Sequence, residues 1–495
     1  MDVNTELYAP LGAGRGLVPS GEAIYQRDKL AVTLERIAFY GVLGLIALVA
    51  IPYGGVEPWW TALANCLVFV LASLRIVEAS LRRDWWIAGV GMMIPLLALC
   101  VFAGLQILPL GASQLNTIAS GNAWRTISVD PFETRRFVFR LLAALLAGEL
   151  LMRYTSSRRR LAAVVGVVIG VGVLSACFGF VRQMAQTSPE GFILPKLPIG
   201  EGYGQFINRN HFALLMEMSL GLLLGLLIGQ SRLRSRFLPY LSLALVVWVA
   251  LVSTNSRGGV ISMFGLILCV AISHLAIQRW RSSKRHELQA RSWMARYGSI
   301  AAMSGVLAMS LVLLTAIGVV WVGGDPVVSR METVSSELGK ESNGKVERKE
   351  IWHATWQLIK AHPFAGIGFG GYETAIPEFY DNFSGGQSLR QAHNDYLEIL
   401  ASGGIIAAVL VVWFLIVMAR KIVAQLQVRS SFRYSTCLGA LAGLFAVSIH
   451  SFFDFGLHIT VNALVFTCLV VIATANCISQ PTMSSEEGAV TVSGV

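Results

Sequence analysis

Three arginines and one histidine of this sequence have residue types and surroundings suited to chemistry. Arg209 lies in the segment FINRNH, Arg257 in STNSRGG and His393 in AHNDYLE, while Arg348 lies in a polar stretch between the last two. Guanidinium groups stabilise a diphosphate through paired hydrogen bonds without a metal ion. A histidine accepts the proton of an attacking hydroxyl near neutral pH. The set therefore fits glycosyl transfer from a polyprenyl-diphosphate sugar.

Each of these residues also has an ordinary structural explanation. Arginines beside apolar runs can lie among lipid headgroups, with their stems along apolar surface. Arg209 and Arg257 are surrounded by Asn, Ser and Gly, which favours a polar cavity instead. His393 can be a packed or capping residue. We expect it near a helix N-terminus, which disfavours protonation of its ring, and on one helical face with Leu397 and Leu400.

The elements that position these residues are predicted to be membrane-spanning helices. Of the 495 residues, 55% are hydrophobic and 14% are charged, with a mean hydropathy of +0.62, whereas soluble domains carry about 25% charged residues. The apolar residues form long blocks, which only helices can carry across lipid. We therefore predict an all-α polytopic protein with about twelve spans. The expected spans are 34–51, 60–77, 85–108, 137–152, 161–180, 212–229, 238–252, 258–277, 299–321, 403–419, 436–453 and 460–478.

The basic residues predict the orientation of these spans. Clusters of Arg and Lys precede the first span and then fall in every second loop, which places both termini in the cytoplasm. The net charge of +10 then reflects loops beside anionic lipid and does not indicate a nucleic-acid partner. The four chemical residues fall on the opposite, outer side. The predicted divisions are a cytoplasmic tail (1–33), spans one to nine (34–321), a large outer loop with short helices (322–402), the last three spans (403–478) and a second cytoplasmic tail (479–495).

Three further motifs of the outer side are expected to have structural roles. The apolar pattern at 351–359 predicts a short helix lying over the membrane face, ended by Pro363. The segment GIGFGG (366–371) lacks the surroundings of a dinucleotide site and predicts a tight glycine turn. Asp454, in HSFFDF at the outer end of the eleventh span, is expected to be a packed polar contact. The sequence has no HExxH motif and no CxxC pair, so we expect no metal or other cofactor.

The same residues carry a resemblance to a known family. The segments are GQFINRNHFA (204–213), SRGG (256–259), Arg348 with Trp352, HPFAGIG (362–368), HNDYL (393–397) and SFFDF (451–455). In their order and topology they resemble the O-antigen ligase and O-antigen or exopolysaccharide polymerase superfamily of bacterial inner-membrane proteins.

The resemblance implies a GT-C-like multi-helix fold and a metal-independent, inverting glycosyl transfer at the periplasmic face of the inner membrane. The donor would be an undecaprenyl-diphosphate-linked glycan, and the acceptor would be a glycan, lipid A-core or a protein. The family's proposed catalytic base corresponds to His393, and its donor-binding arginines correspond to Arg209, Arg257 and Arg348. The supporting residues would be Asn208, Asn210, His211, Asn394, Tyr396 and Asp454.

Two other classes of function stay open. A transporter or flippase for a lipid-linked sugar would use the arginines as a substrate path, although transporters more often carry broken helices and ionisable residues near mid-membrane. A non-enzymatic assembly scaffold would not need the cations. Within the enzyme class, the motifs do not separate a ligase, a polymerase and a protein O-oligosaccharyltransferase.

Overall fold

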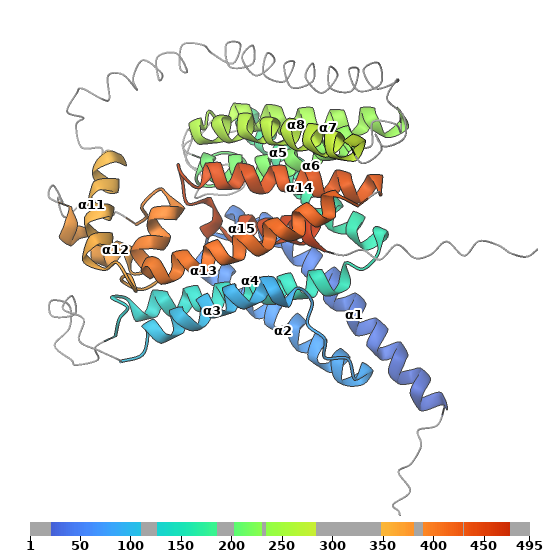
Figure 1. Ribbon diagram of the computed structural model, residues 1–495, viewed down its shortest axis with the longest axis horizontal. Coiled ribbons are helices and arrows are strands. Elements are labelled where there is room, and N and C mark those ends of the chain that lie inside the picture. Colours follow the sequence, from blue (N-terminus) through green and yellow to red (C-terminus); the bar gives the residue numbers. More distant parts are fainter. Residues whose placement is uncertain are drawn as a thin grey trace, which may run out of the picture.

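The computed structural model describes residues 21–109, 126–185, 202–229, 234–283, 348–380, 390–428 and 430–475. Every regular element in these ranges is a helix (Figure 1), which confirms the predicted all-α fold. Seven of the described helices are long and apolar enough to cross a membrane. They are α1 (Gly21–Ala50), α2 (Pro58–Arg82), α5 (Arg158–Ala185), α6 (Arg209–Gly229), α8 (Arg257–Ser283), α13 (Asp395–Leu426) and α14 (Ser431–His450).

The other helices are shorter or more polar. They are α3 (Val90–Gln106), α4 (Pro131–Tyr154), α7 (Arg234–Ser253), α11 (Arg348–Ala361), α12 (Tyr372–Ala375) and α15 (Thr460–Thr474). Eleven of the twelve predicted spans fall on α1–α8 and α13–α15, and the predicted span at 299–321 lies outside the described residues. Figure 1 shows α11 and α12 at one end of the bundle, which we call the α11 end, and the start of α1 at the opposite end.

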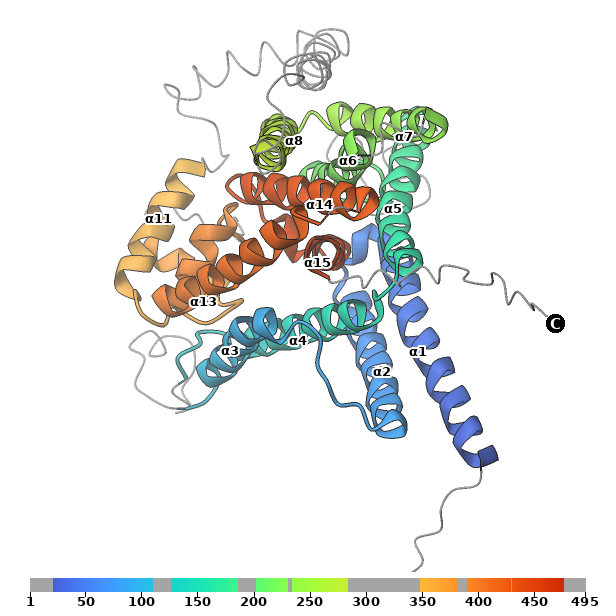
Figure 2. The ribbon, with the colours of Figure 1, turned by 45° about the vertical axis from the view of Figure 1, so that its right-hand side comes forward.

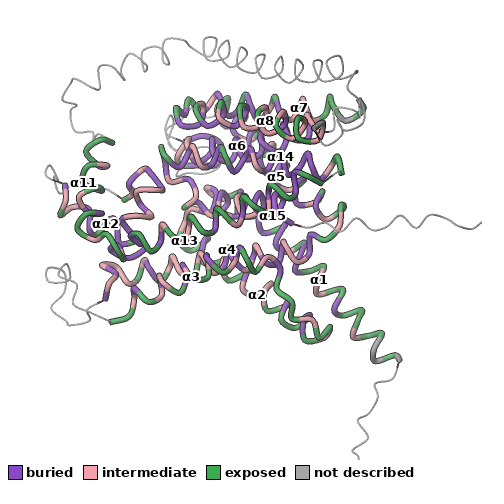
Figure 3. The backbone as a smooth tube through the Cα atoms, viewed as in Figure 1, coloured by how far each residue is buried: buried purple, intermediate pink, exposed green. Residues whose placement is uncertain are grey.

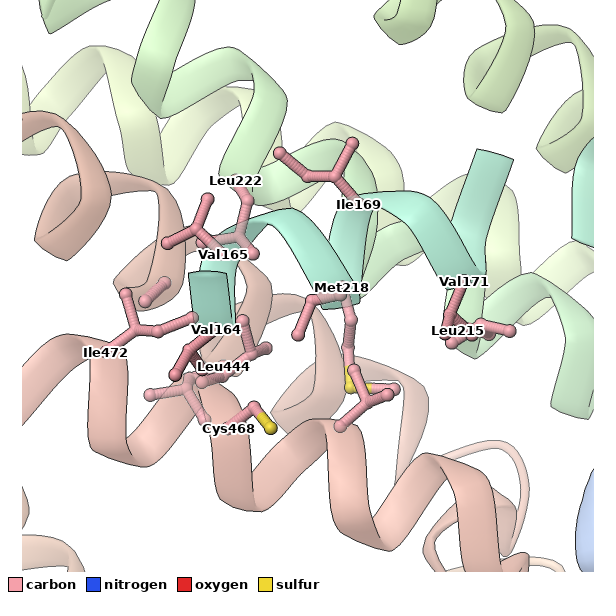
Figure 4. Packing of buried hydrophobic residues seen from close by; sticks show 14 of the residues in the cluster. Val164, Val165, Ile169, Val171, Leu215, Met218, Leu222, Leu444, Cys468 and Ile472 are labelled. Carbon is pink, nitrogen blue, oxygen red and sulfur yellow. The ribbon is translucent and has the colours of Figure 1, made fainter. Parts of the chain in front are cut away.

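The centre of the bundle is formed by α6, α14 and α15, with the other long helices around them (Figure 2). Nearly all of α6 is buried (Figure 3), whereas α13 exposes large apolar side chains such as Val409, Val412 and Trp413. Figure 4 shows the core where α5, α6, α14 and α15 meet. An apolar core together with an apolar outer surface is the pattern of helices whose outer faces contact lipid.

α6 packs closely against α14, and both carry glycines four residues apart. A Cβ on Gly221 would lie 2.7 Å from the backbone of Gly443, and a Cβ on Gly225 would lie 2.4 Å from that of Gly439. Small residues at this spacing let two backbones approach closely in a membrane, where packing drives association. This contact holds α6 and α14 together.

Replacing Gly225 with alanine is expected to destabilise the protein by about 1–3 kcal/mol, because the new methyl group overlaps the backbone of α14. The matched control is Gly166→Ala in α5, where a Cβ would meet open space. Thermal or denaturant unfolding of the purified protein in detergent measures both. Equal stability of the two variants would contradict the proposed packing of α6 on α14.

α13 is broken at Gly404, whose φ of 58° and ψ of −157° are not helical. The segment 363–368 lies against this break. There, Ile367 and Gly368 donate backbone hydrogen bonds of 3.0 and 2.9 Å to the carbonyls of 401–402. Gly368 has a φ of +93°, which side chains other than that of glycine rarely allow. The predicted tight glycine turn is confirmed, and it satisfies carbonyls that the broken helix leaves without helical partners.

The predicted amphipathic helix at 351–359 is present as α11. Its buried residues, including Ile351 and Leu358, pack on Tyr372, Ile376 and their neighbours. The apolar face of α11 is therefore covered by the chain's own elements. The helix ends at Ala361, just before the predicted stop.

Arginines at the end opposite α11 bind carbonyls at helix C-termini. Arg433 donates to the last carbonyls of α15, and Arg281 donates to Leu426 and Val428 at the end of α13, each at 3.0 Å. Cations are favourable at these positions because helix C-termini carry partial negative charge. Basic residues of the predicted inner loops thus also fasten the ends of the helices.

Candidate functional site

Arg209 and Arg257 are the first residues of α6 and α8. Asn208 Oδ1 accepts the backbone N–H of Asn210 at 2.8 Å, and Asn210 Oδ1 accepts the hydroxyl of Ser256 at 2.8 Å. The Ser256 oxygen also accepts a backbone N–H of the first turn of α8 at 3.1 Å. The two arginines therefore begin helices whose N-termini are joined, and such N-termini carry partial positive charge that suits an anion.

Arg348 is the first residue of α11, and its side chain is exposed. The same helix is tied to the segment before α13, because the indole N–H of Trp352 donates to the carbonyl of Ala392 at 3.1 Å. Ala392 immediately precedes His393. The contact thus connects the helix of the third arginine with the candidate base.

His393 lies outside α13, so the prediction that it shares a helical face with Leu397 is wrong. The helix begins two residues later, at Asp395, because Asn394 is its N-cap. The Asn394 side chain accepts the backbone N–H groups of Tyr396 and Leu397 at 3.0 and 3.1 Å. His393 itself has a φ of +49°, a left-handed conformation that few residues other than glycine adopt. Its side chain remains 35% exposed, so an incoming group can reach the ring.

The partner of His393 is Asp454, in the turn between α14 and α15. His393 Nδ1 donates to Asp454 Oδ1 at 3.2 Å, and Asp454 is fully buried. Burial by itself raises the pKa of this carboxyl. The hydrogen bond from His393 and the interactions with His211 and His450 outweigh burial and hold the pKa well below its ordinary value. Asp454 is therefore ionised, neutral His393 carries its hydrogen on Nδ1, and Nε2 keeps a lone pair.

Besides Asn208 and Asn210 at the joined helix N-termini, the four other supporting residues predicted from the sequence divide into two groups. Asn394 and Tyr396 serve the local fold, since Asn394 caps α13 and the Tyr396 hydroxyl donates to the carbonyl of Ser448 at 2.7 Å. His211 and Asp454 lie with His393, because His211 Nε2 is 3.7 Å from Asp454 Oδ2. From the sequence, Asp454 was predicted to be a packed polar contact. The structure adds that it is the hydrogen-bond partner of His393.

Sequence reasoning missed a second buried pair near the site. His450 Nδ1 lies 2.8 Å from Glu217 Oε1, and both side chains are fully or almost fully buried. A single acidic residue within the apolar run of α6 was the available signal, since ionisable residues inside spans usually have a specific partner. In the described parts of the chain, no group of three or more His, Cys, Asp or Glu side chains could hold a metal ion.

Comparison with known families matches residues 241–412 to the family model described as O-antigen ligase. The matched range contains Arg257, Arg348 and His393, while Arg209 and Asp454 lie on either side of it. No curated protein matches the chain.

Proposed function

Since residues 241–412 assign this chain to the O-antigen ligase family, we propose that it transfers an undecaprenyl-diphosphate-linked glycan to a hydroxyl acceptor. The family and the apolar helices make the chain a multi-pass membrane protein with a role in glycosyl transfer for surface polysaccharides. The observation that carries the finer proposal is the pair of His393 and buried Asp454, held beside the helix that Arg209 begins.

The proposed reaction is an inverting displacement at the anomeric carbon of the donor. The acceptor oxygen forms a bond to this carbon, and His393 Nε2 takes the hydroxyl proton. The bond from the anomeric carbon to the diphosphate oxygen breaks, and its electron pair leaves with the lipid diphosphate. Asp454 stabilises the imidazolium that forms. The buried carboxylate of a Ser-His-Asp triad does the same for its histidine, through a hydrogen bond to Nδ1.

The arginines would stabilise the leaving diphosphate. Arg209 and Arg257 begin helices whose partial positive charge adds to that of the guanidinium groups, so a metal ion is not required for charge balance. Arg348 would bind the diphosphate or glycan from the side of α11.

Replacing Arg257 with alanine is expected to weaken donor binding by about 10- to 100-fold, the effect of losing a charge-assisted hydrogen bond. The measurement is binding of a labelled undecaprenyl-diphosphate glycan to the purified protein in nanodiscs. Arg36→Ala on the exposed face of α1 is the matched control and should bind as the unaltered protein does. Donor binding that is unchanged in Arg257→Ala would remove this arginine from the site.

The proposed orientation places both termini in the cytoplasm and the α11 end in the periplasm of a bacterial inner membrane. One observation supports it. Basic residues of the predicted inner loops bind helix ends opposite α11, and such residues favour the cytoplasmic side. The described part of the predicted outer loop, 348–380 and 390–402, would then lie on the periplasmic side.

The break in α13 at Gly404 is a feature that transporters also use, which keeps a lipid-linked glycan transporter as the alternative. In transporters, the groups freed by such a break contact the substrate. Here, the carbonyls of 401–402 accept hydrogen bonds from 363–368 of the same chain. The break therefore anchors the loop segment that leads toward the site, which favours the enzyme.

Reconstitution in liposomes with a fluorescent lipid-linked glycan separates these functions. An enzyme gives a covalent product with an added acceptor, whereas a transporter moves the intact donor across the bilayer. A longer lipid-linked chain identifies a polymerase, glycan on lipid A-core identifies a ligase, and glycan on a protein identifies a protein O-oligosaccharyltransferase. Movement of intact donor with no covalent product would overturn the proposal.

A further inference from the structure

Asp454 uses only one of its two carboxylate oxygens with His393. The other, Oδ2, lies 3.7 Å from Nε2 of His211, just beyond hydrogen-bond length. Among the described residues, neither of these two atoms has a hydrogen-bond partner, and both are buried. Unpaired polar atoms are unfavourable in a protein interior, and an approach of less than 1 Å would pair this donor and acceptor.

The position of His211 is fixed from two sides. It lies on the first turn of α6, where the Asn462 amide donates to the His211 carbonyl at 3.0 Å and to that of Gly456 at 3.1 Å. Its ring meets the Phe455 ring edge-on at 4.9 Å, and His393 meets the same Phe455 ring at 5.0 Å. The two histidines therefore share Phe455 and Asp454 as common neighbours.

We infer that His211 is a positioning residue, whose Nε2–H holds the second oxygen of Asp454 so that the first stays with His393. The inference rests on the proposed role of His393 as the base. A hydrogen bond to Oδ2 also spreads the negative charge of Asp454, so the carboxylate favours protonated His393 less strongly and the ring stays available as a base. Since His211 follows Arg209 by two residues, the contact connects the donor-binding end of α6 with the base.

The other ionisable groups around Asp454 have partners of their own. They are His450 at the end of α14, Asp395 at the start of α13 and His458 in the turn before α15. His450 is bonded to Glu217, Asp395 accepts the hydroxyl of Ser451, and His458 lies 3.8 Å from Asp395. Glu398, on the first turn of α13, faces His393 itself and accepts the backbone N–H of Ala392 at 3.2 Å. A substitution at His211 leaves all these contacts in place, so a changed titration of His393 reports the contact between His211 and Asp454.

The primary test does not depend on glycan transfer. Diethyl pyrocarbonate reacts with neutral imidazole, and peptide mass spectrometry gives its rate at the partly exposed His393 as a function of pH. His211→Phe keeps a ring against Phe455 but loses the N–H. This variant is expected to move the midpoint of the rate profile of His393 up by about 0.5–1 pH unit. His211→Gln retains an N–H donor and should keep the original midpoint. An unchanged midpoint in His211→Phe would overturn the inference.

The matched control is His274→Phe, which removes another buried histidine. His274 lies in α8, and its Nδ1 is 2.9 Å from the Tyr434 hydroxyl. It should leave the midpoint of His393 unchanged. In a transfer assay, His211→Phe is expected to lower kcat by about 3- to 10-fold on the acidic side of its pH profile, with the donor KM unchanged, and to recover at higher pH. An equal loss at every pH would indicate a merely structural role. A shifted midpoint in His211→Phe, together with no glycan transfer by the unaltered protein, would uphold the contact and reject the proposed function.

Discussion

Replacing His393 with alanine is expected to reduce glycan transfer by at least about 100-fold, because a positioned general base contributes on that order or more. The side chain is partly exposed and its hydrogen bond goes to Asp454, so its removal takes away little packing. It does leave a buried carboxylate without its partner, which lowers stability. The expected loss must therefore be measured on protein that is shown to be folded.

A second substitution separates chemistry from folding. In His393→Asn, the side-chain amide can still donate to Asp454 from near the position of Nδ1, but it offers no basic nitrogen in place of Nε2. This variant should unfold at the same temperature as the unaltered protein and transfer no faster than His393→Ala. His353→Ala, on the exposed face of α11, should retain full activity. Full activity in His393→Asn would rule out this residue as the base.

Replacing Asp454 with asparagine is expected to lower kcat by a factor on the order of 10²–10⁴, as losses of the carboxylate behind a histidine base do. The asparagine oxygen can still accept from His393 Nδ1, so the geometry can be kept. The negative charge that stabilises the developing imidazolium is lost. The donor KM should stay the same, because Asp454 is buried and contacts His393 rather than the diphosphate arginines.

The pH dependence of kcat in Asp454→Asn distinguishes a role in the chemistry from a role in the fold. Without the charge of Asp454, protonated His393 is less favoured, so the acidic limb of the kcat profile should move to lower pH. This is opposite to the direction expected for His211→Phe. Asp84 lies between α2 and α3 and is paired with Arg153 of α4. Asp84→Asn, which removes this carboxylate, should change neither kcat nor the pH profile. A fall in activity with no movement of the acidic limb would mean that Asp454 supports the fold only.

The long apolar runs could be predicted from the sequence because each run depends only on neighbouring residues and on the requirement that lipid imposes on the backbone. The same local logic located Arg209 and Arg257 at helix ends, and the structure makes each the first residue of its helix. The glycine turn at 366–371 was also predictable, because only glycine readily adopts the positive φ values found there.

The features that could not be predicted depend on contacts between distant segments. Asp454 lies 61 residues after His393, and only the packing of α13 beside α14 brings the two together. The glycines of α6 and α14 are informative only once these helices are known to be neighbours. His393 was misplaced because the capping strength of Asn394 decides where α13 begins, and the apolar periodicity does not report it.

The most direct test of the account is covalent transfer by the purified protein alone. The protein in liposomes would receive an undecaprenyl-diphosphate glycan and a hydroxyl acceptor, and mass spectrometry would detect the new glycosidic bond and free undecaprenyl diphosphate. We expect stoichiometric amounts of both from the unaltered protein, with inverted anomeric configuration, and neither above background from His393→Asn. Transfer by His393→Asn at the unaltered rate, or no product from folded protein that binds the donor, would contradict it.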